Sequence, residues 1–316
     1  MPDAEQSYKS ALEYLYSFVD YSLKHSSELA KADFNLERMR SLMAEIGNPQ
    51  DRYPTVHVAG TKGKGSVSAL IASGMQAAGL RVGLYTSPHL LDYNERIRID
   101  TEPVSHEGLV ELVESVKPAV ARIPKLTTFE ITTALGFLYF ARQHVDAAVI
   151  EVGLGGRLDA TNVILPKVSV ITSLSYDHMA VLGNTLAQIA REKAGIIKAG
   201  VPVVSAPQKD EALDVLVEVA ESRKAPFTLV GQDVTFRPIH HSLDGQSLKV
   251  ESGEATYTFS IPLLGGHQVQ NAAVAAAALW NLRSQRIGIP DEAILQGFAM
   301  VRWPARFEVV RREPPV

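Results

Sequence analysis

Residues 60–66 read Gly60-Thr61-Lys62-Gly63-Lys64-Gly65-Ser66, and they follow a short β-branched run around Val56 and Val58. The residues after the stretch, 66–78, are typical of a helix. A strand, a glycine-rich loop and a helix in this order form the setting of a phosphate-binding loop. Glycines let backbone N–H groups converge, the helix N-terminus adds partial positive charge, and a lysine reaches the terminal phosphates. We therefore predict that this loop binds the phosphates of a nucleotide.

The loop departs from the strict P-loop pattern at two positions. Val58 stands at the place of the first glycine, and Gly65 rather than Ser or Thr follows Lys64. A hydroxyl that ligates Mg²⁺ must therefore come from Ser66 or from elsewhere in the chain. The alternative is an ordinary glycine-rich βα turn, but turn chemistry alone does not explain two lysines and three glycines within seven residues.

Short β-branched runs and helical stretches alternate through the middle of the chain. The β runs are 55–59, 81–86, 147–152, 168–172 and 201–205, and the helical stretches are 66–78, 105–123, 130–143, 185–197 and 210–222. This alternation predicts βαβ units, and hence an α/β fold with a mostly parallel P-loop sheet. The β runs are apolar on both faces, so helices are expected to flank the sheet on both sides.

Two segments lie outside this alternation. Apolar positions at helical spacing predict a helical N-terminal segment over residues 1–50. Residues 227–262 alternate around turns and predict a small antiparallel β patch, with strands at 228–236, 247–251 and 255–261. After this patch we expect helices at 270–283 and 290–300, and a strand at 306–310.

The composition excludes several classes of protein. The chain has 316 residues, 46% of them apolar, which suits a globular protein with a large core. Its 31 basic and 35 acidic side chains give a net charge of −4, which does not favour nucleic acid. Without cysteine there is no disulfide, thiolate nucleophile or cysteine-ligated zinc. The longest apolar stretch, 272–280, is too short for a membrane span, so we expect a cytoplasmic protein with neither nucleic acid nor membrane as partner.

Polar residues follow three further β runs, where ligands of a parallel sheet collect. Ser87 follows the run 81–86, Glu151 ends an apolar run, and Asp177 and His178 come a few residues after 168–172. Oxygen ligands suit Mg²⁺, so Ser87, Glu151 and Asp177 are candidates and His178 is a less typical neighbour. The structural alternatives are a helix cap for Ser87, a salt bridge for Glu151 and a hydrogen-bonded structural histidine for His178. For Lys193, on a helix with Ile189 and Ile197, the default interpretation is a solvated lysine.

Eight motifs in chain order resemble the Mur ligase superfamily, and more closely the folylpolyglutamate synthases, which in many bacteria are also dihydrofolate synthases. They are GTKGKGS (60–66), YTSPHL (85–90), FEITT (129–133), EVGLGGRLDATN (151–162), DH followed by LG (177–183), REKAGIIK (191–198), GGHQVQNAAVA (265–275) and WPARFE (303–308). The segment GLGGRLDATN and the glycine after Lys64 favour the folate branch over the peptidoglycan ligases.

The resemblance implies an ATP- and Mg²⁺-dependent amide ligase. Enzymes of this family convert a carboxylate into an acyl phosphate, which the amine of glutamate then attacks. The implied small-molecule partners are L-glutamate and either folate or dihydropteroate, and the implied state is a monomer. A monovalent cation can accompany Mg²⁺ in the implied site.

The resemblance also assigns roles to individual residues. The implied catalytic residues are Lys64, Lys193 and His178, and Lys193 matches a lysine that the superfamily carbamylates. The implied magnesium ligands are Ser87, Glu151 and His178. The implied ATP-binding residues are Thr61, Lys62, Gly63, Lys64, Gly65 and Ser66, together with Asn271 for adenine and Arg306 for the phosphates. The implied pterin-binding residues are Asp33, Phe34, Asn35, Leu36, Thr127, Phe129, Leu158, Asp159 and Ala160.

Three positions depart from the family pattern. Lys62 stands where Asn is common, Ala305 replaces a glycine before Arg306, and Asn35 replaces a glycine in the first loop. The resemblance places a Mur-ligase-type ATP-binding domain over 1–300 and the start of a linker over 301–316, and we expect the family's C-terminal Rossmann-like ligase domain to be absent. The alternatives are a nucleotide-binding domain that binds ATP without ligase activity of its own, and a small-molecule kinase or NTPase with the same loop.

Overall fold

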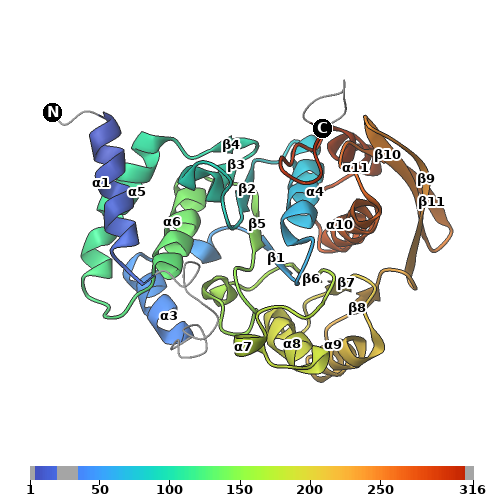
Figure 1. The fold of residues 1–316 in the computed structure, drawn as a ribbon, viewed down its shortest axis with the longest axis horizontal. Helices are drawn as coiled ribbons and strands as arrows, with labels where there is room; N and C mark the ends of the chain where they lie inside the picture. Colours follow the sequence, from blue (N-terminus) through green and yellow to red (C-terminus); the bar gives the residue numbers. More distant parts are fainter. Residues whose placement is uncertain (1–3, 20–34, 310–316) are drawn as a thin grey trace.

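The computed structural model describes residues 4–19 and 35–309, and a large sheet lies at its centre (Figure 1). The strand order is β4-β3-β2-β5-β1-β6-β7-β8. The strands are β1 (Thr55–Ala59), β2 (Val82–Tyr85), β3 (Ile97–Ile99), β4 (Glu102–Pro103), β5 (Ala147–Glu151), β6 (Val168–Ile171), β7 (Val203–Ser205) and β8 (Phe227–Leu229). Because β1 lies between β5 and β6, the glycine-rich loop leaves the sheet at its middle.

The five predicted β runs form β1, β2, β5, β6 and β7, which pair in parallel, but the prediction of a mostly parallel sheet with a small antiparallel patch needs correction. The sheet is mixed, because β3 and β4 add two antiparallel pairings at one edge. These strands have three and two residues, too few to show a period in the sequence. The predicted strand 228–236 is also wrong. Its first part is β8, which pairs in parallel with β7.

Ten α-helices within the described residues surround the sheet. They are α1 (Ala4–Tyr16), α3 (Leu36–Glu45), α4 (Lys64–Ala77), α5 (His106–Val120), α6 (Thr128–Arg142), α7 (Met179–Leu182), α8 (Leu186–Lys193), α9 (Asp210–Ser222), α10 (Gly266–Ser284) and α11 (Asp291–Met300). Short 3₁₀ turns are η2 (Pro49–Asp51), η3 (Tyr93–Arg96), η4 (Ala160–Val163) and η5 (Ala194–Ile196). Among the described residues, no helix is long and apolar enough to cross a bilayer.

Different helices cover the two faces of the large sheet (Figure 1). On one face, α4 and α10 pack against alternate strand residues such as Val56 and Val58 in one apolar cluster. On the other face, α1, α3, α5 and α6 pack against residues such as Ile150, and α8 and α9 pack against Ile171. Strand alternation therefore places His57 on this second face, where the two helix groups meet.

A separate antiparallel sheet lies against α10 and α11 (Figure 1). Its strands are β9 (Val234–Ser242), β10 (Gly245–Ser252) and β11 (Ala255–Ile261), in the order β11-β10-β9. Buried Leu248, Val250 and Phe259 join it to the cluster that includes α4 and α10. The predicted helices at 270–283 and 290–300 are confirmed as α10 and α11, although α10 begins four residues earlier, at Gly266.

The predicted strand at 306–310 is wrong over its described part, because residues 306–309 form no strand. Ala305 and Phe307 have φ values of +55° and +61°, which are incompatible with an extended strand. The segment from Trp303 instead turns back toward the glycine-rich loop, and Trp303 packs against Gly65.

Candidate active site

The glycine-rich loop joins β1 to α4 at the carboxyl edge of the sheet. β1 ends at Ala59, and α4 begins at Lys64 with Gly63 as its N-cap at a φ of +90°. A Cβ on Gly63 would lie 2.5 Å from Oδ1 of Asn271 on α10. Glycine is therefore required at this position by the backbone conformation and by the close approach of α10. The predicted adenine contact, Asn271, thus lies directly against the phosphate loop.

Hydrogen bonds tie the first part of the loop to the segment after β6. The N–H groups of Thr61 and Lys62 both donate to the carbonyl of Ser173, at 3.0 and 3.2 Å. The Thr61 hydroxyl donates to the Ser175 carbonyl at 3.1 Å and accepts from the Ser175 N–H at 3.2 Å. The N–H groups in the first turn of α4 have no acceptor within the helix, so they are the donors available to an anion.

The residues after Lys64 explain the departure from the P-loop pattern. A Cβ on Gly65 would lie 2.9 Å from Cζ2 of Trp303, so the indole ring takes the space of a side chain at this position. The buried Ser66 hydroxyl accepts a hydrogen bond from Nε2 of Gln268 at 3.3 Å. Position 65 therefore has no room for a hydroxyl side chain, and the Ser66 hydroxyl is hydrogen-bonded to a residue of α10.

Glu151 and Ser87 meet beside the loop, as the sequence predicted from their strand ends. Tyr85 of β2 pairs with Ile150 of β5, and the Ser87 N–H donates to Oε2 of Glu151 at 3.2 Å. Burial raises the pKa of Glu151 to about 7, although the positive charges of Lys64 and Arg306 and the Ser87 N–H act in the opposite direction. A buried carboxylate held beside cations is suited to contact a further cation.

Lys193 is buried, so the default interpretation of a solvated helix lysine is wrong. It is the last residue of α8, is 4% exposed, and donates from Nζ to the carbonyl of Gly60 at 2.9 Å. Burial and the nearby charge of Lys64 lower its pKa to about 7, while Asp177 and Asp159 act to raise it. The lysine therefore contacts the phosphate loop itself and is partly neutral near pH 7.

His178 lies at the surface, and its imidazole lies near the carboxylate of the neighbouring Asp177. It is the N-cap of the short helix α7 with a φ of +46°, and its Nε2 lies 3.7 Å from Oδ1 of Asp177. Over residues 4–19 and 35–309, no three His, Cys, Asp or Glu side chains are grouped closely enough to hold a metal ion. Of the three predicted magnesium ligands, the structure thus brings Ser87 and Glu151 into contact, and the role of His178 stays a prediction.

The loop after β5 carries the buried carboxylate of Asp159. Its Oδ2 accepts from the Leu154 N–H at 2.8 Å, and its Oδ1 accepts from the N–H and hydroxyl of Thr161 at 3.0 and 2.5 Å. Burial raises the pKa of Asp159, while its hydrogen bonds and the charge of Lys64 lower it. Phe129 approaches the same loop, because a Cβ on Gly153 would lie 2.5 Å from its Cζ.

The other predicted pterin residues lie at the ends of two helices and in this loop. Thr127 caps α6 in a reciprocal pair with Glu130, which also pairs with Arg38 of α3 at 3.1 Å. Asn35 caps α3 through the Glu37 N–H. Leu36 and Ala160 are buried and Leu158 is half-buried, while Asp33 and Phe34 lie outside the described residues.

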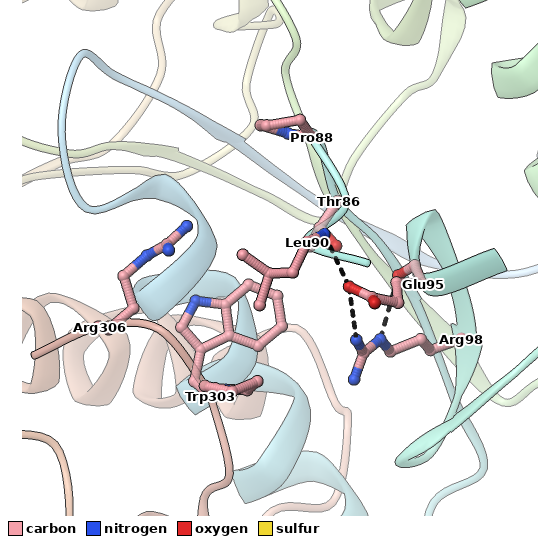
Figure 2. A pocket seen from close by; sticks show the side chains of 8 residues that line it. Thr86, Pro88, Leu90, Glu95, Arg98, Trp303 and Arg306 are labelled. Atoms are coloured by element: carbon pink, nitrogen blue, oxygen red, sulfur yellow. Dashed lines mark hydrogen bonds and ion pairs between the residues drawn. The ribbon is translucent and has the colours of Figure 1, made fainter. Parts of the chain in front are cut away.

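A pocket opens between the C-terminal segment and the loop after β2 (Figure 2). Its lining residues are Thr86, Pro88, Leu90, Glu95, Arg98, Trp303, Pro304 and Arg306. The Arg98 guanidinium lies 5.7 Å from the centroid of the Trp303 ring and pairs with Glu95 at 3.7 Å. Arg306 and Trp303 enter from one side and Thr86 and Pro88 from the other (Figure 2), so the predicted phosphate contact Arg306 shares a pocket with the segment that precedes Ser87.

The sequence did not indicate three residues that shape the site: His57, Thr161 and Trp303. His57 on β1 accepts or donates through Nε2 to the Thr161 hydroxyl at 2.8 Å, and Trp303 covers Gly65. Only His57 had a usable signal, since a histidine in an apolar strand needs a buried partner. The partner itself is 104 residues away in sequence.

Together these features define a class of enzyme. A phosphate loop, a buried carboxylate after a neighbouring strand and a buried lysine meet at one edge of an α/β sheet, and residues 58–279 match the family described as "Mur ligase middle domain". The chain is therefore a Mur-type ligase.

A curated relative from Bacillus subtilis, dihydrofolate synthase/folylpolyglutamate synthase, is 43% identical over 289 residues, which is 89% of this chain and 67% of the relative. The folylpolyglutamate synthase of Lacticaseibacillus casei is 37% identical over 316 residues, with 98% and 72% covered.

Solved structures give the same assignment. The structure described as "FPGS-AMPPCP complex" superposes with a TM-score of 0.90 at 36% identity, over 98% of this chain and 75% of that one. The structure described as "apo form of L. casei FPGS" gives a TM-score of 0.89 with the same coverage. The chain belongs to the folylpolyglutamate synthase/dihydrofolate synthase family, which places it among the ATP-dependent ligases.

The expectation that the fold is defined by an absent C-terminal domain is not upheld. The superposition extends over 98% of this chain, and the chain holds both the large mixed sheet and the separate antiparallel sheet. These two sheets, rather than a missing domain, describe the fold.

Proposed function

We propose that the chain uses ATP and Mg²⁺ to add L-glutamate to folate, and to dihydropteroate as well, through an acyl phosphate. The observation that carries the proposal is the meeting of Lys64, Glu151 and Lys193 around one phosphate loop. The B. subtilis relative is named for both activities, and a solved relative is described as "FPGS-AMPPCP-folate complex". These names support a small-molecule substrate pair, and we propose that a single copy of the chain suffices to bind it.

The chemical difficulty is that two anions must react. A carboxylate attacks a triphosphate only when the negative charge on the phosphates is neutralised and the reacting oxygens are held in line. Lys64 and the first-turn N–H groups of α4 supply fixed positive charge, as in other phosphoryl transfers. Arg306 adds a second cation near Glu151. Amide formation then needs no enzyme nucleophile, which agrees with a chain that lacks cysteine.

The residues present fit a magnesium ion. Glu151 is a buried carboxylate that lacks a direct salt bridge among the described residues, and Ser87, whose backbone N–H donates to it, carries a hydroxyl. This oxygen donor set is the kind that Mg²⁺ binds while keeping several waters. When bound, the ion would neutralise phosphate charge, and Glu151, Ser87 and His178 are the proposed ligands.

Lys193 supports carbamylation through its burial and its partly neutral amine. A neutral amine nitrogen can attack the carbon of CO₂ and release a proton, which leaves a carbamate anion in place of a cation. With its pKa lowered to about 7, a large fraction of Lys193 is neutral at physiological pH. The carbamate would add a negative group beside Gly60, where a divalent cation or a monovalent cation would balance it.

The test of the proposed function is Lys64→Ala. We expect kcat for ATP-dependent glutamate ligation to fall by about 100- to 1,000-fold, as on removal of an electrostatic donor elsewhere. Amide product is measured by mass spectrometry with tetrahydrofolate or dihydropteroate as acceptor. Lys249→Ala, in the separate antiparallel sheet, is the matched control and should keep full activity.

The same assay separates the alternatives. A kinase would give a phosphorylated acceptor without an amide, and a nucleotide-binding module would bind ATP without any product. Undiminished ligation by Lys64→Ala would contradict the proposal.

A further inference from the structure

A histidine with no role in the proposed chemistry lies under the loop that follows β5. His57 is the central residue of β1 and is 0% exposed. It stands in register with Ile150 of β5 on one side and Ser169 of β6 on the other. A histidine in the middle of a buried sheet needs a hydrogen-bond partner, since an unpaired polar group there is costly.

The partner fixes the protonation of the imidazole. Nε2 of His57 lies 2.8 Å from the Thr161 hydroxyl, and this hydroxyl donates its single proton to Oδ1 of Asp159 at 2.5 Å. The hydroxyl can therefore only accept from His57, so Nε2 carries the hydrogen. Among the described residues, the buried Nδ1 has no hydrogen-bond partner, and a proton there would be an unsatisfied donor. Burial and the charge of Lys198 also lower the pKa of His57, in keeping with a neutral ring.

The hydrogen bonds from His57 through Thr161 end at the Asp159 carboxylate, where most acceptor positions are occupied. Oδ1 of Asp159 accepts from the hydroxyl and the N–H of Thr161, and Oδ2 accepts from the Leu154 N–H. A carboxylate can accept about four hydrogen bonds, so within the described part of the chain one acceptor position remains, on Oδ2. With Oδ1 held by two donors, the carboxylate plane cannot turn freely, and the remaining position has a fixed direction.

We propose that His57 and Thr161 are positioning residues that orient the Asp159 carboxylate to accept a hydrogen bond from an N–H group of a pterin ring. This inference rests on the proposed function, which gives Asp159 a pterin as its ligand. The lone remaining acceptor position suits an amino-heterocycle that presents an N–H donor. His57 touches neither the ligand nor the reacting atoms and acts only through Thr161.

The test compares variants at Thr161 that differ in one group. Thr161→Val keeps the shape but removes the hydroxyl, so Oδ1 loses a donor and His57 loses its acceptor. We expect KM for the folate substrate to rise about tenfold, with KM for ATP and kcat within about twofold of wild type. Thr161→Ser restores the hydroxyl and should bring KM for folate back to near the wild-type value.

A double-mutant cycle with Asp159→Asn shows whether the effect passes through Asp159. If it does, Thr161→Val adds little to KM for folate in the Asp159→Asn background. His57→Gln, which keeps an N–H donor, serves as the second variant if Thr161→Val does not fold, and its effect on KM for folate should be lost in the same background. A folded Thr161→Val with unchanged KM for folate, or with folate and ATP values raised alike, would overturn the inference.

A spectroscopic measurement keeps this inference distinct from the proposed function. The ¹⁵N chemical shifts of the His57 ring should show the Nε2–H form in the free protein across pH 5 to 8, and Thr161→Val should change the shift of Nε2. If the wild type gave this signature but no ligase product, the proposed function would be wrong, but the hydrogen bonds from His57 through Thr161 to Asp159 would be confirmed. A charged ring or an Nδ1–H form would overturn the inference whatever the activity.

Discussion

At the scale of single residues, the site holds two ionisable groups whose pKa values move toward each other. Burial raises the pKa of Glu151 to about 7 and lowers that of Lys193 to about 7. Both shifts have burial as their largest cause, since each group lies in the core and has no direct ion pair within residues 4–19 and 35–309. Such convergence is typical of functional sites, where a group must change its protonation or bind an ion near neutral pH.

The raised pKa of Glu151 predicts how stability depends on pH. Because the folded-state pKa lies above the ordinary value of 4.5, the folded protein binds the proton more tightly, and the free energy of unfolding falls as pH rises from about 4.5 to about 7. Glu151→Gln removes this loss, so with EDTA present it should be more stable than wild type at pH 8, by up to about 3 kcal/mol, and nearly equal at pH 5. Denaturant unfolding at the two pH values measures the difference.

Glu218→Gln is the matched control for this prediction. Glu218 pairs with Arg191 on the surface, and its pKa is lowered rather than raised, so its variant should show no gain in stability at pH 8. A Glu151→Gln protein that differs from wild type by the same amount at both pH values would show that the carboxylate is ionised throughout.

At the scale of elements, the sequence predicted the strands that end at the site better than it predicted the strands near the edge of the large sheet. The central runs became β1, β2, β5, β6 and β7, whose residues are buried along the whole strand. The strands β3 and β4 were missed because β3 is only partly buried at Arg98 and β4 is exposed, and 306–310 was taken for a strand because its residues favour β structure. Ala305 and Phe307 are exposed and have positive φ values, which an extended strand excludes.

The contact between α4 and the C-terminal segment predicts a penalty for the usual P-loop residue. Gly65→Ser would improve helix propensity by about 0.5 kcal/mol. The added atoms would, however, meet the Trp303 ring at 2.9 Å, and overpacking of this kind costs about 1–3 kcal/mol, so the variant should be less stable than wild type. Thermal unfolding measures the loss, and Trp303→Leu should relieve it in the double variant. A Gly65→Ser protein as stable as wild type would show that the indole does not occupy this space.

At the scale of the whole molecule, the contacts in the site that follow from the strand topology could be predicted. The contacts between residues far apart in the sequence could not. Ser87 and Glu151 were placed together because the carboxyl ends of parallel strands meet at one edge, and the structure confirms their contact. The burial of Lys193 against Gly60 and the contact of His57 with Thr161 join residues more than 100 positions apart. No local pattern encodes such contacts, because each depends on how the helices cover the sheet.

We propose that a substrate carboxylate attacks the terminal phosphate of ATP at the edge formed by Lys64 and Glu151. The most direct test uses a folate substrate whose reacting carboxylate carries ¹⁸O at both oxygens, turned over with unlabelled ATP and glutamate. Attack by the carboxylate forms an acyl phosphate, and displacement by the amine then leaves the bridging oxygen on phosphate. We predict one ¹⁸O atom in the inorganic phosphate for each amide formed, as measured by mass spectrometry. Amide formation with unlabelled phosphate would contradict an acyl phosphate mechanism.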